Sequence, residues 1–331
     1  MRQKPLCRNA YPGASFLSTQ EMCTTISTVN MSREDWLRLR KSGIGGSDAG
    51  AICGLNPYTG PMSVYRDKTS EDVSDTDNEA MRQGRDLEDY VARRFMEATG
   101  LKVRRSNMMY RSDEHPCMIA DVDRLVVGED AGLECKTASA YNADKWKDGT
   151  VPMHYIIQCA HYMAVTGKKA WYIAVVILGQ EFKFARITRD DSMIANLIAI
   201  EESFWTNYIV PRIIPPPDGS KVCDEVLEQY FHRARKDSTI PLIGFDEKLN
   251  RRTQLMGQIK ELEQEQRQIE QEVKLFMQDN ETAASENYRV SWTNVDTARL
   301  DTKRMKAEKP EIYQDFVKVT SSRRLTIRAA G

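Results

Sequence analysis

Apolar residues recur at helical spacing in several parts of the chain. Leu87, Val91 and Phe95 lie four residues apart and Gly100 follows them, which predicts a helix over 81–99. The same reasoning predicts further helices over the following segments: 32–40, 152–165 and 192–209.

Strand-like segments lie between these helices. Residues 117–127 and 133–137 are two such runs, and the glycine-bounded turn 128–132 joins them into a predicted hairpin. Two further strands are predicted over 170–178 and 182–187, on either side of a short glycine turn. The middle of the chain therefore combines helices with strands.

The C-terminal third has a different pattern, and the proline run 215–217 marks its beginning. Apolar residues follow alternating steps of four and three over about 245–279, with polar Gln266 in the one gap, a heptad stripe typical of a long amphipathic helix. Its members are Leu255, Ile259, Leu262, Ile269, Val273 and Phe276. The stripe spans only about three heptads, so an arm packed on the body and a helix that binds a partner both stay open. Terminal strands are predicted over 288–293 and 324–328.

These patterns divide the chain into three parts. Residues 1–31 lack periodicity and are expected to be a disordered lead-in, 32–217 form the main domain, and 218–331 form a C-terminal extension. The longest apolar run, 170–178, is too short to span a bilayer. No membrane association is therefore expected.

Composition adds little to this picture. Charged residues make up 29% of the 331 positions and hydrophobic residues 41%, and the net charge is -1. A nucleic-acid-binding protein is not excluded, because acidic metal ligands and basic phosphate contacts cancel in the sum. The seven cysteines include no C-x-x-C pair, which argues against a zinc site and a disulfide framework and favours a reducing cytoplasm.

The candidate chemistry centres on the predicted hairpin. Glu134 and Lys136 lie two apart on a strand and therefore point the same way. Asp123 lies on the preceding strand, and two acids that meet across a hairpin form an oxygen-rich site suited to Mg²⁺ or Mn²⁺. Lys136 would stabilise negative charge on a phosphate. Asp121 competes with Asp123 as the ligand.

An E-x-K pattern alone is weak, and this chain has three. Glu181 and Lys183 have no acid just upstream, and Glu272 lies on the heptad helix, where residues two apart face different sides. Only the pair at Glu134 has a partner acid. The alternative interpretation, an exposed ion pair, would gain little free energy and would leave Asp123 unexplained.

Other residues extend the candidate site. Glu88, on the helix before the strands, is either a third carboxylate for a second metal or an ordinary surface glutamate. Gln158 and Tyr162 lie four apart and share a helix face. Ser47 follows two glycines whose N–H groups suit a phosphate, and Arg40 could bind that phosphate bidentately. A plain glycine turn between two helices is the alternative there.

Five short motifs occur in order along the chain. They are Gly43–Ala49, Gly84–Glu88, Ala120–Arg124, Glu134–Thr137 and Gln158–Tyr162. As an ordered set over roughly 33–210, they resemble the YqaJ-like viral recombinase family, relatives of the lambda exonuclease in the PD-(D/E)xK nuclease superfamily. Val122 departs from that pattern, because the family often has proline before the metal-binding aspartate. This position needs only extended backbone.

The resemblance implies a fold and an activity. The fold is α/β, a restriction-endonuclease-like core with a mixed central sheet flanked by helices, followed by the long C-terminal helix and small terminal strands. The activity is Mg²⁺-dependent 5′ to 3′ digestion of one strand of linear double-stranded DNA for phage-type homologous recombination. Two Mg²⁺ ions serve each site, and Mn²⁺ can substitute.

The resemblance also implies roles for particular residues. Asp123, Glu134 and the backbone carbonyl of Cys135 bind metal, and Glu88 helps at the second metal position. Lys136 is the catalytic lysine and Gln158 orients water or phosphate. Arg40 and Ser47 hold the terminal 5′-phosphate.

Partners follow from the same resemblance. They are double-stranded DNA ends, a single-strand annealing protein and further copies of the chain in a homo-oligomer, with a trimeric ring as one form, all in the host cytoplasm. Three other functions stay open: a structure-specific or nicking endonuclease, a non-catalytic DNA-end-binding module, and a coiled-coil adaptor built on the C-terminal helix.

Overall fold

The computed structural model of the protein describes residues 23–72 and 78–328. The chain divides into two compact units, Met1–Phe231 and His232–Gly331. The division falls after the proline run expected to end the main domain, because helix α7 (Lys221–Tyr230) packs on α3 (Pro61–Thr69) through Cys223, Val226 and Met62. Neither α3 nor α7 was expected from periodicity.

A five-stranded mixed sheet forms the centre of the first unit. Its order is β2-β5-β6-β7-β8, in which β6 and β7 run parallel and the other neighbours run antiparallel. The strands are β2 (Val103–Arg105), β5 (Arg124–Val126), β6 (Ala131–Ala138), β7 (Ala170–Ile177) and β8 (Glu181–Thr188). The predicted hairpins β5–β6 and β7–β8 are therefore confirmed.

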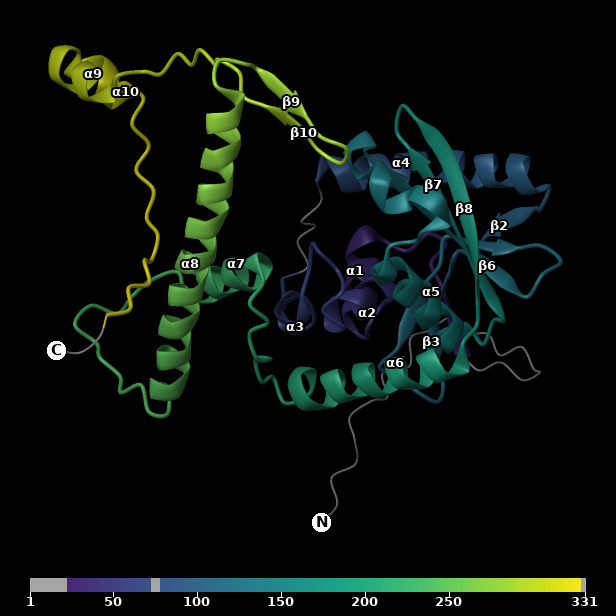
Figure 1. The fold of residues 1–331 in the computed structure, drawn as a ribbon. Helices are drawn as coiled ribbons and strands as arrows, with labels where there is room; N and C mark the ends of the chain where they lie inside the picture. Colours follow the sequence, from purple (N-terminus) through teal and green to yellow (C-terminus); the bar gives the residue numbers. More distant parts are fainter. Residues whose placement is uncertain (1–22, 73–77, 329–331) are drawn as a thin grey trace. The chain divides into compact units, whose positions relative to one another are not determined.

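Helices cover both faces of this sheet (Figure 1). On one face, α4 (Glu79–Thr99) buries Val91 and Phe95 against β6 and β7. On the other face, α5 (Met153–Thr166) and α6 (Asp191–Phe204) pack in the larger core cluster. The helices α4 and α5 end at glycines with positive φ, Gly100 and Gly167. The predicted α/β class, a mixed central sheet flanked by helices, is confirmed.

The predicted strand over 117–127 is interrupted. Its first part, β4 (Ile119–Asp121), joins a separate three-stranded sheet of order β1-β3-β4, and its second part is β5. In that small sheet β1 (Cys23–Ser27) pairs with β3 (Met108–Ser112). The expected disordered lead-in was therefore wrong for the segment that forms β1, since pairing with a distant strand fixes it. Residues 1–22 lie outside the described residues.

The N-terminal helices carry the glycine-rich motif. Helix α1 (Arg33–Lys41) begins as predicted at Ser32, whose side chain accepts a hydrogen bond from the N–H of Asp35. Helix α2 (Gly46–Ile52) begins inside the segment expected to be a turn. A Cβ at Gly46 would lie 2.6 Å from Cε1 of Tyr162, so only glycine lets α2 approach α5 this closely.

The sequence pattern missed the 3₁₀ segment η1 (Ala140–Gly149). The predicted helix over 192–209 is confirmed, since α6 continues into the π-helical turn η2 (Trp205–Ile209).

The second unit contains the predicted long helix α8 (Asp246–Met277). Strands β9 (Thr282–Ala284) and β10 (Arg289–Ser291) form a small hairpin, followed by α9 (Thr302–Glu308) and α10 (Pro310–Asp315). The strand expected over 324–328 was wrong, since no strand forms there. None of the described helices is long and apolar enough to cross a membrane.

Candidate active site

The parallel strand β6 presents an acid and an amine side by side. The Nζ of Lys136 lies 2.6 Å from Oε1 of Glu134, whose side chain is 4% exposed. From α5, the amide of Gln158 donates to the same Oε1 at 2.7 Å and to the hydroxyl of Tyr162 at 2.8 Å. The alternation of strand side chains and one face of α5 thus bring these four residues together.

Asp123 lies in the break between β4 and β5 rather than on a continuous strand. Its Oδ2 accepts a hydrogen bond from the N–H of Cys135 at 2.7 Å, which places it beside the central residue of the E-x-K motif. Arg124 pairs with Leu133 in the hairpin register, so the next position brings Asp123 opposite Glu134. Burial, and then the charges of Glu134 and Glu88, raise the pKa of Asp123 well above its ordinary value.

Glu88 is paired with Arg124. The buried guanidinium donates to Oε1 of Glu88, to Oδ1 of Asp89 at 2.6 Å and to the carbonyl of Asp123 at 2.7 Å. One arginine therefore pairs with two acids of α4 and also donates to the backbone at Asp123. The sequence gives no direct signal of this role, although Arg124 is adjacent to the candidate ligand.

The carboxylates suit a divalent cation, although they are not arranged as a complete cage. In the described part of the chain, no three His, Cys, Asp or Glu side chains form a group that could hold a metal ion. Oε2 of Glu134, however, is buried and has no hydrogen-bond partner. An unpartnered buried oxygen beside an aspartate of raised pKa is the environment that a hard cation would stabilise.

Lys136 also lies against an aromatic wall that the sequence did not reveal. Its Nζ is 4.8 Å from the ring centroid of Tyr155 on α5, and Trp146 of η1 stacks on that ring with centroids 5.6 Å apart. Burial by itself would lower the pKa of Lys136. The negative charge of Glu134, together with smaller effects of other nearby groups, outweighs burial and raises that pKa. The amine is therefore kept positively charged.

The two predicted phosphate-binding residues also meet. Nη2 of Arg40, in the last turn of α1, donates to Oγ of Ser47 in the first turn of α2 at 3.0 Å. Ser47 is exposed and Arg40 is half-buried, so both remain reachable from solvent. A guanidinium beside the N-terminus of a helix favours an anion.

The competing acid, Asp121, has a different partner. Its Oδ2 accepts a hydrogen bond from Nε1 of Trp36 at 3.0 Å. The same indole ring lies 4.3 Å from the guanidinium carbon of Arg33 and 5.6 Å from that of Arg40. The structure thus places Asp121 toward α1 and Asp123 toward β6.

The second E-x-K pair provides a comparison within the same sheet. Lys183 lies 2.9 Å from Glu181 on β8, but this glutamate is 51% exposed, and Lys183 also donates to the carbonyl of Trp146. The third pair, with Glu272, lies on α8 in the second unit. Neither has the buried surroundings of Glu134.

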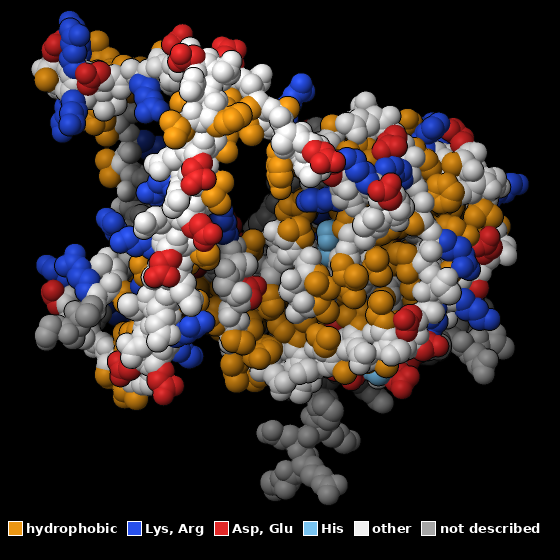
Figure 2. Space-filling view, in the orientation of Figure 1, with side chains coloured by type: hydrophobic (Ala, Val, Ile, Leu, Met, Phe, Trp, Pro, Cys, Tyr) orange, Lys and Arg blue, Asp and Glu red, His pale blue; other side chains and the backbone are white. Residues whose placement is uncertain are grey.

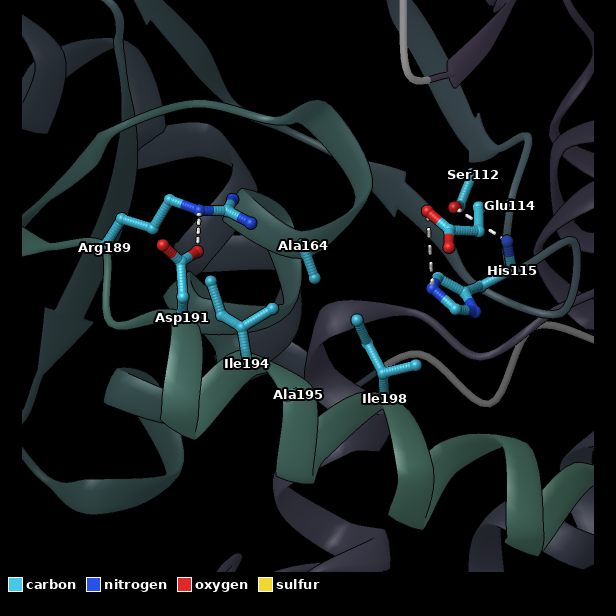
Figure 3. Close-up of a pocket in the computed structure, with 9 residues that line it drawn as sticks. All are labelled: Ser112, Glu114, His115, Ala164, Arg189, Asp191, Ile194, Ala195 and Ile198. Atoms are coloured by element: carbon cyan, nitrogen blue, oxygen red, sulfur yellow. Dashed lines mark hydrogen bonds and ion pairs between the residues drawn. The ribbon is translucent and has the colours of Figure 1, made fainter.

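A separate pocket of about 250 Å³ opens elsewhere on the first unit (Figure 3). Its walls combine apolar residues of α5 and α6 with charged side chains, among them Arg189, which lies 2.6 Å from Asp191. None of its lining residues belongs to the candidate site. The site built on β6 is therefore not this pocket.

Comparison with known proteins identifies the family to which the chain belongs. Residues 35–169 match the family described as the YqaJ-like viral recombinase domain. The protein of Bacillus subtilis (strain 168) named "Uncharacterized protein YqaJ" is 38% identical over 303 residues, which cover 90% of this chain and 95% of that relative. The chain belongs to the YqaJ-like viral recombinase family. The resemblance inferred from the five motifs is thereby confirmed.

Solved structures similar to this member of the YqaJ-like family are more distant. An alkaline exonuclease of Laribacter hongkongensis is 20% identical with a TM-score of 0.45, covering 54% of this chain and 94% of that one. Its complex with dAMP gives 0.48 at 20% identity, covering 60% and 98%. A phage-related exonuclease of Haemophilus somnus 129PT gives 0.39 at 13% identity, covering 53% and 99%.

Proposed function

We propose that this protein is a Mg²⁺-dependent deoxyribonuclease that digests one strand of linear double-stranded DNA from its 5′ end during phage-type homologous recombination. The observation that carries the proposal is the cluster on β6. A buried glutamate oxygen without a partner, a second carboxylate and a charged lysine converge there. Membership of the YqaJ-like viral recombinase family supports the same assignment.

Asp123, Glu134 and the carbonyl of Cys135 would hold the metal, and Glu88 would complete a second position once released from Arg124. Bound Mg²⁺, with Mn²⁺ as a substitute, supplies charge neutralisation and a water of lowered pKa. Gln158 would orient water or phosphate, and its hydrogen bond also holds the carboxylate of Glu134 in place.

Lys136 contributes positive charge at the reacting phosphate. Its ammonium is paired with Glu134 and supported by the ring of Tyr155, so it is oriented before substrate binds. Preorganised donors of this kind stabilise the charge that develops in the transition state without reorganising. No proton need be exchanged by Lys136 itself, because its raised pKa keeps it protonated.

Arg40 and Ser47 would bind the terminal 5′-phosphate. Contacts to phosphates carry no base information, so digestion should be sequence-tolerant and should weaken as salt rises. Ends that carry a 5′-phosphate are expected to be digested faster than hydroxyl ends. Equal rates on the two ends would remove this assignment and leave the metal site untouched.

Partners belong to the proposal as well. We expect DNA ends, a single-strand annealing protein and a homo-oligomer, with a trimeric ring as one form, in the host cytoplasm. The stripe of α8 is exposed, with Leu262 at 65% and Ile269 at 56%. Acidic side chains follow the helix (Figure 2).

The glutamates that flank the stripe are Glu263, Glu265, Glu270 and Glu272. They occupy the positions that would face each other between two copies of α8, where like charges repel. A homo-oligomer is therefore expected to form without α8.

The test compares linear and closed circular duplex, each with Mg²⁺ or with EDTA. Release of acid-soluble nucleotides from the linear duplex alone, and only with Mg²⁺, supports the exonuclease. Nicking of the circle at a similar rate would indicate an endonuclease that uses the same site. Binding of DNA ends without nucleotide release would indicate a non-catalytic DNA-end-binding module.

A further inference from the structure

Lys68 is a lysine whose side chain is fully buried where three helices meet. It lies on α3, and its Nζ forms an ion pair with Oδ2 of Asp48 on α2 at 2.7 Å. The same Nζ donates at 3.0 Å to the carbonyl oxygen of Arg40, in the last turn of α1. A buried ammonium thus joins the end of one helix to the start of the next.

These two contacts frame the Arg40–Ser47 pair. The Lys68 ammonium holds the backbone of Arg40 directly, and it holds Ser47 through the adjacent Asp48. Asp48 in turn accepts from the N–H of Gly45 at 2.9 Å, which closes the turn between the helices. Last-turn carbonyls of a helix lack intrahelical donors, so an ammonium there is a natural partner.

The charges around Lys68 are matched. Burial alone would raise the pKa of Asp48, but the charges of Lys68 and Arg40 outweigh it and hold that pKa below its ordinary value. The other acid near the ammonium is Asp67, 3.4 Å away and 48% exposed. The buried Lys68 side chain cannot contact a substrate, so it can affect substrate binding only by positioning Arg40 and Asp48.

We propose that Lys68 is a positioning residue that sets the geometry of Arg40 and Ser47 for a terminal 5′-phosphate on DNA. The proposal rests on the phosphate-binding role assigned to that pair under the proposed function. It adds to that role a residue that touches no substrate. It also explains why Arg40 and Ser47, on the two sides of the linker between α1 and α2, lie at hydrogen-bond distance.

The test measures binding rather than digestion, so it stands apart from the nuclease activity. Fluorescence anisotropy in EDTA gives the ratio of Kd values for duplex ends with a 5′-hydroxyl and with a 5′-phosphate. The key variant is Asp48→Asn/Lys68→Met, which removes one charge of each sign and leaves no buried charge without a partner. Net charge near the phosphate site is therefore unchanged.

The double variant is expected to lose about tenfold in this ratio while it melts like a folded protein, because the hydrogen bond to Arg40 is gone. Asp48→Asn alone keeps that bond but breaks the ion pair through which Lys68 holds Ser47, so it should lose less of the preference than the double variant. Asp67→Asn is the matched control, since it changes the other acid beside Lys68 but neither helix end, and it should keep the preference.

Two outcomes would overturn the proposal. A wild-type ratio retained in the double variant would show that Lys68 does not position the pair. A wild-type protein that binds both ends equally would remove the phosphate role on which the proposal rests. Nuclease failure is detected separately, by digestion of linear duplex with Mg²⁺.

Discussion

Replacing Lys136 by methionine tests the buried pair on β6. The change keeps the length of the side chain and removes the ammonium that lies 2.6 Å from Glu134. The glutamate is left 4% exposed, with Gln158 as its remaining donor. Removing one partner of a buried ion pair typically destabilises by about 3 to 5 kcal/mol. We expect about 3 kcal/mol, because Lys136 is itself 21% exposed.

The assay is thermal unfolding in EDTA, so that metal binding does not contribute. About 3 kcal/mol corresponds to a Tm lower by roughly 6 to 12 °C for a unit of this size. The double variant Glu134→Gln/Lys136→Met removes both charges of this pair and should recover most of the loss. Nuclease activity should fall by about 100- to 1000-fold in both variants, since a preorganised charge is missing.

Lys183→Met is the matched control for this prediction. It breaks the same E-x-K geometry on β8 of the same sheet, but Glu181 is 51% exposed and can be solvated. Exposed pairs contribute about 0 to 1 kcal/mol, so the Tm should change by no more than about 4 °C and digestion should continue. Equal Tm losses for the two single variants, or none for Lys136→Met, would refute the reasoning.

Three further predictions follow from the same contacts. Asp123→Asn should raise the Tm in EDTA, because burial and the charges of Glu134 and Glu88 disfavour the ionised form of this carboxylate. It should also abolish the Tm increase that Mg²⁺ gives the wild type, because a proposed metal ligand is removed. The Asp48 carboxylate has a lowered pKa, so its contribution to stability is present above about pH 4 and is lost as pH falls through the pKa of the folded state. In urea unfolding between about pH 5 and 2, the free energy of unfolding should therefore fall less steeply in Asp48→Asn than in the wild type. Leu262→Glu/Ile269→Glu should change neither the digestion rate nor the mass measured by light scattering, since the candidate site lies in the first unit.

Local periodicity was sufficient to predict the features that lie within a single strand or helix. The spacing of Glu134 and Lys136 on a strand, and of Gln158 and Tyr162 on a helix, places each pair on one face without help from any tertiary contact. The long helix α8 was equally accessible, because a heptad stripe is a property of the helix alone.

Contacts distant in sequence account for what the pattern missed. The strand ends at Asp121 because β4 pairs with β3 in another sheet, and nothing within 117–127 signals that change of partner. The same holds for β1, which depends on β3 for its hydrogen bonds. Lys68 has no motif around it, and its task is visible only when three helices are placed in space.

The most direct measurement of the central claim is nucleotide release from linear duplex by the wild type and by Glu134→Gln/Lys136→Met at equal concentration. The substrate is labelled at either the 5′ or the 3′ end, in Mg²⁺ or EDTA. We predict Mg²⁺-dependent release of the 5′ label first by the wild type, and almost none by the folded double variant. Digestion by the double variant at the wild-type rate would contradict the assignment of the active site to β6.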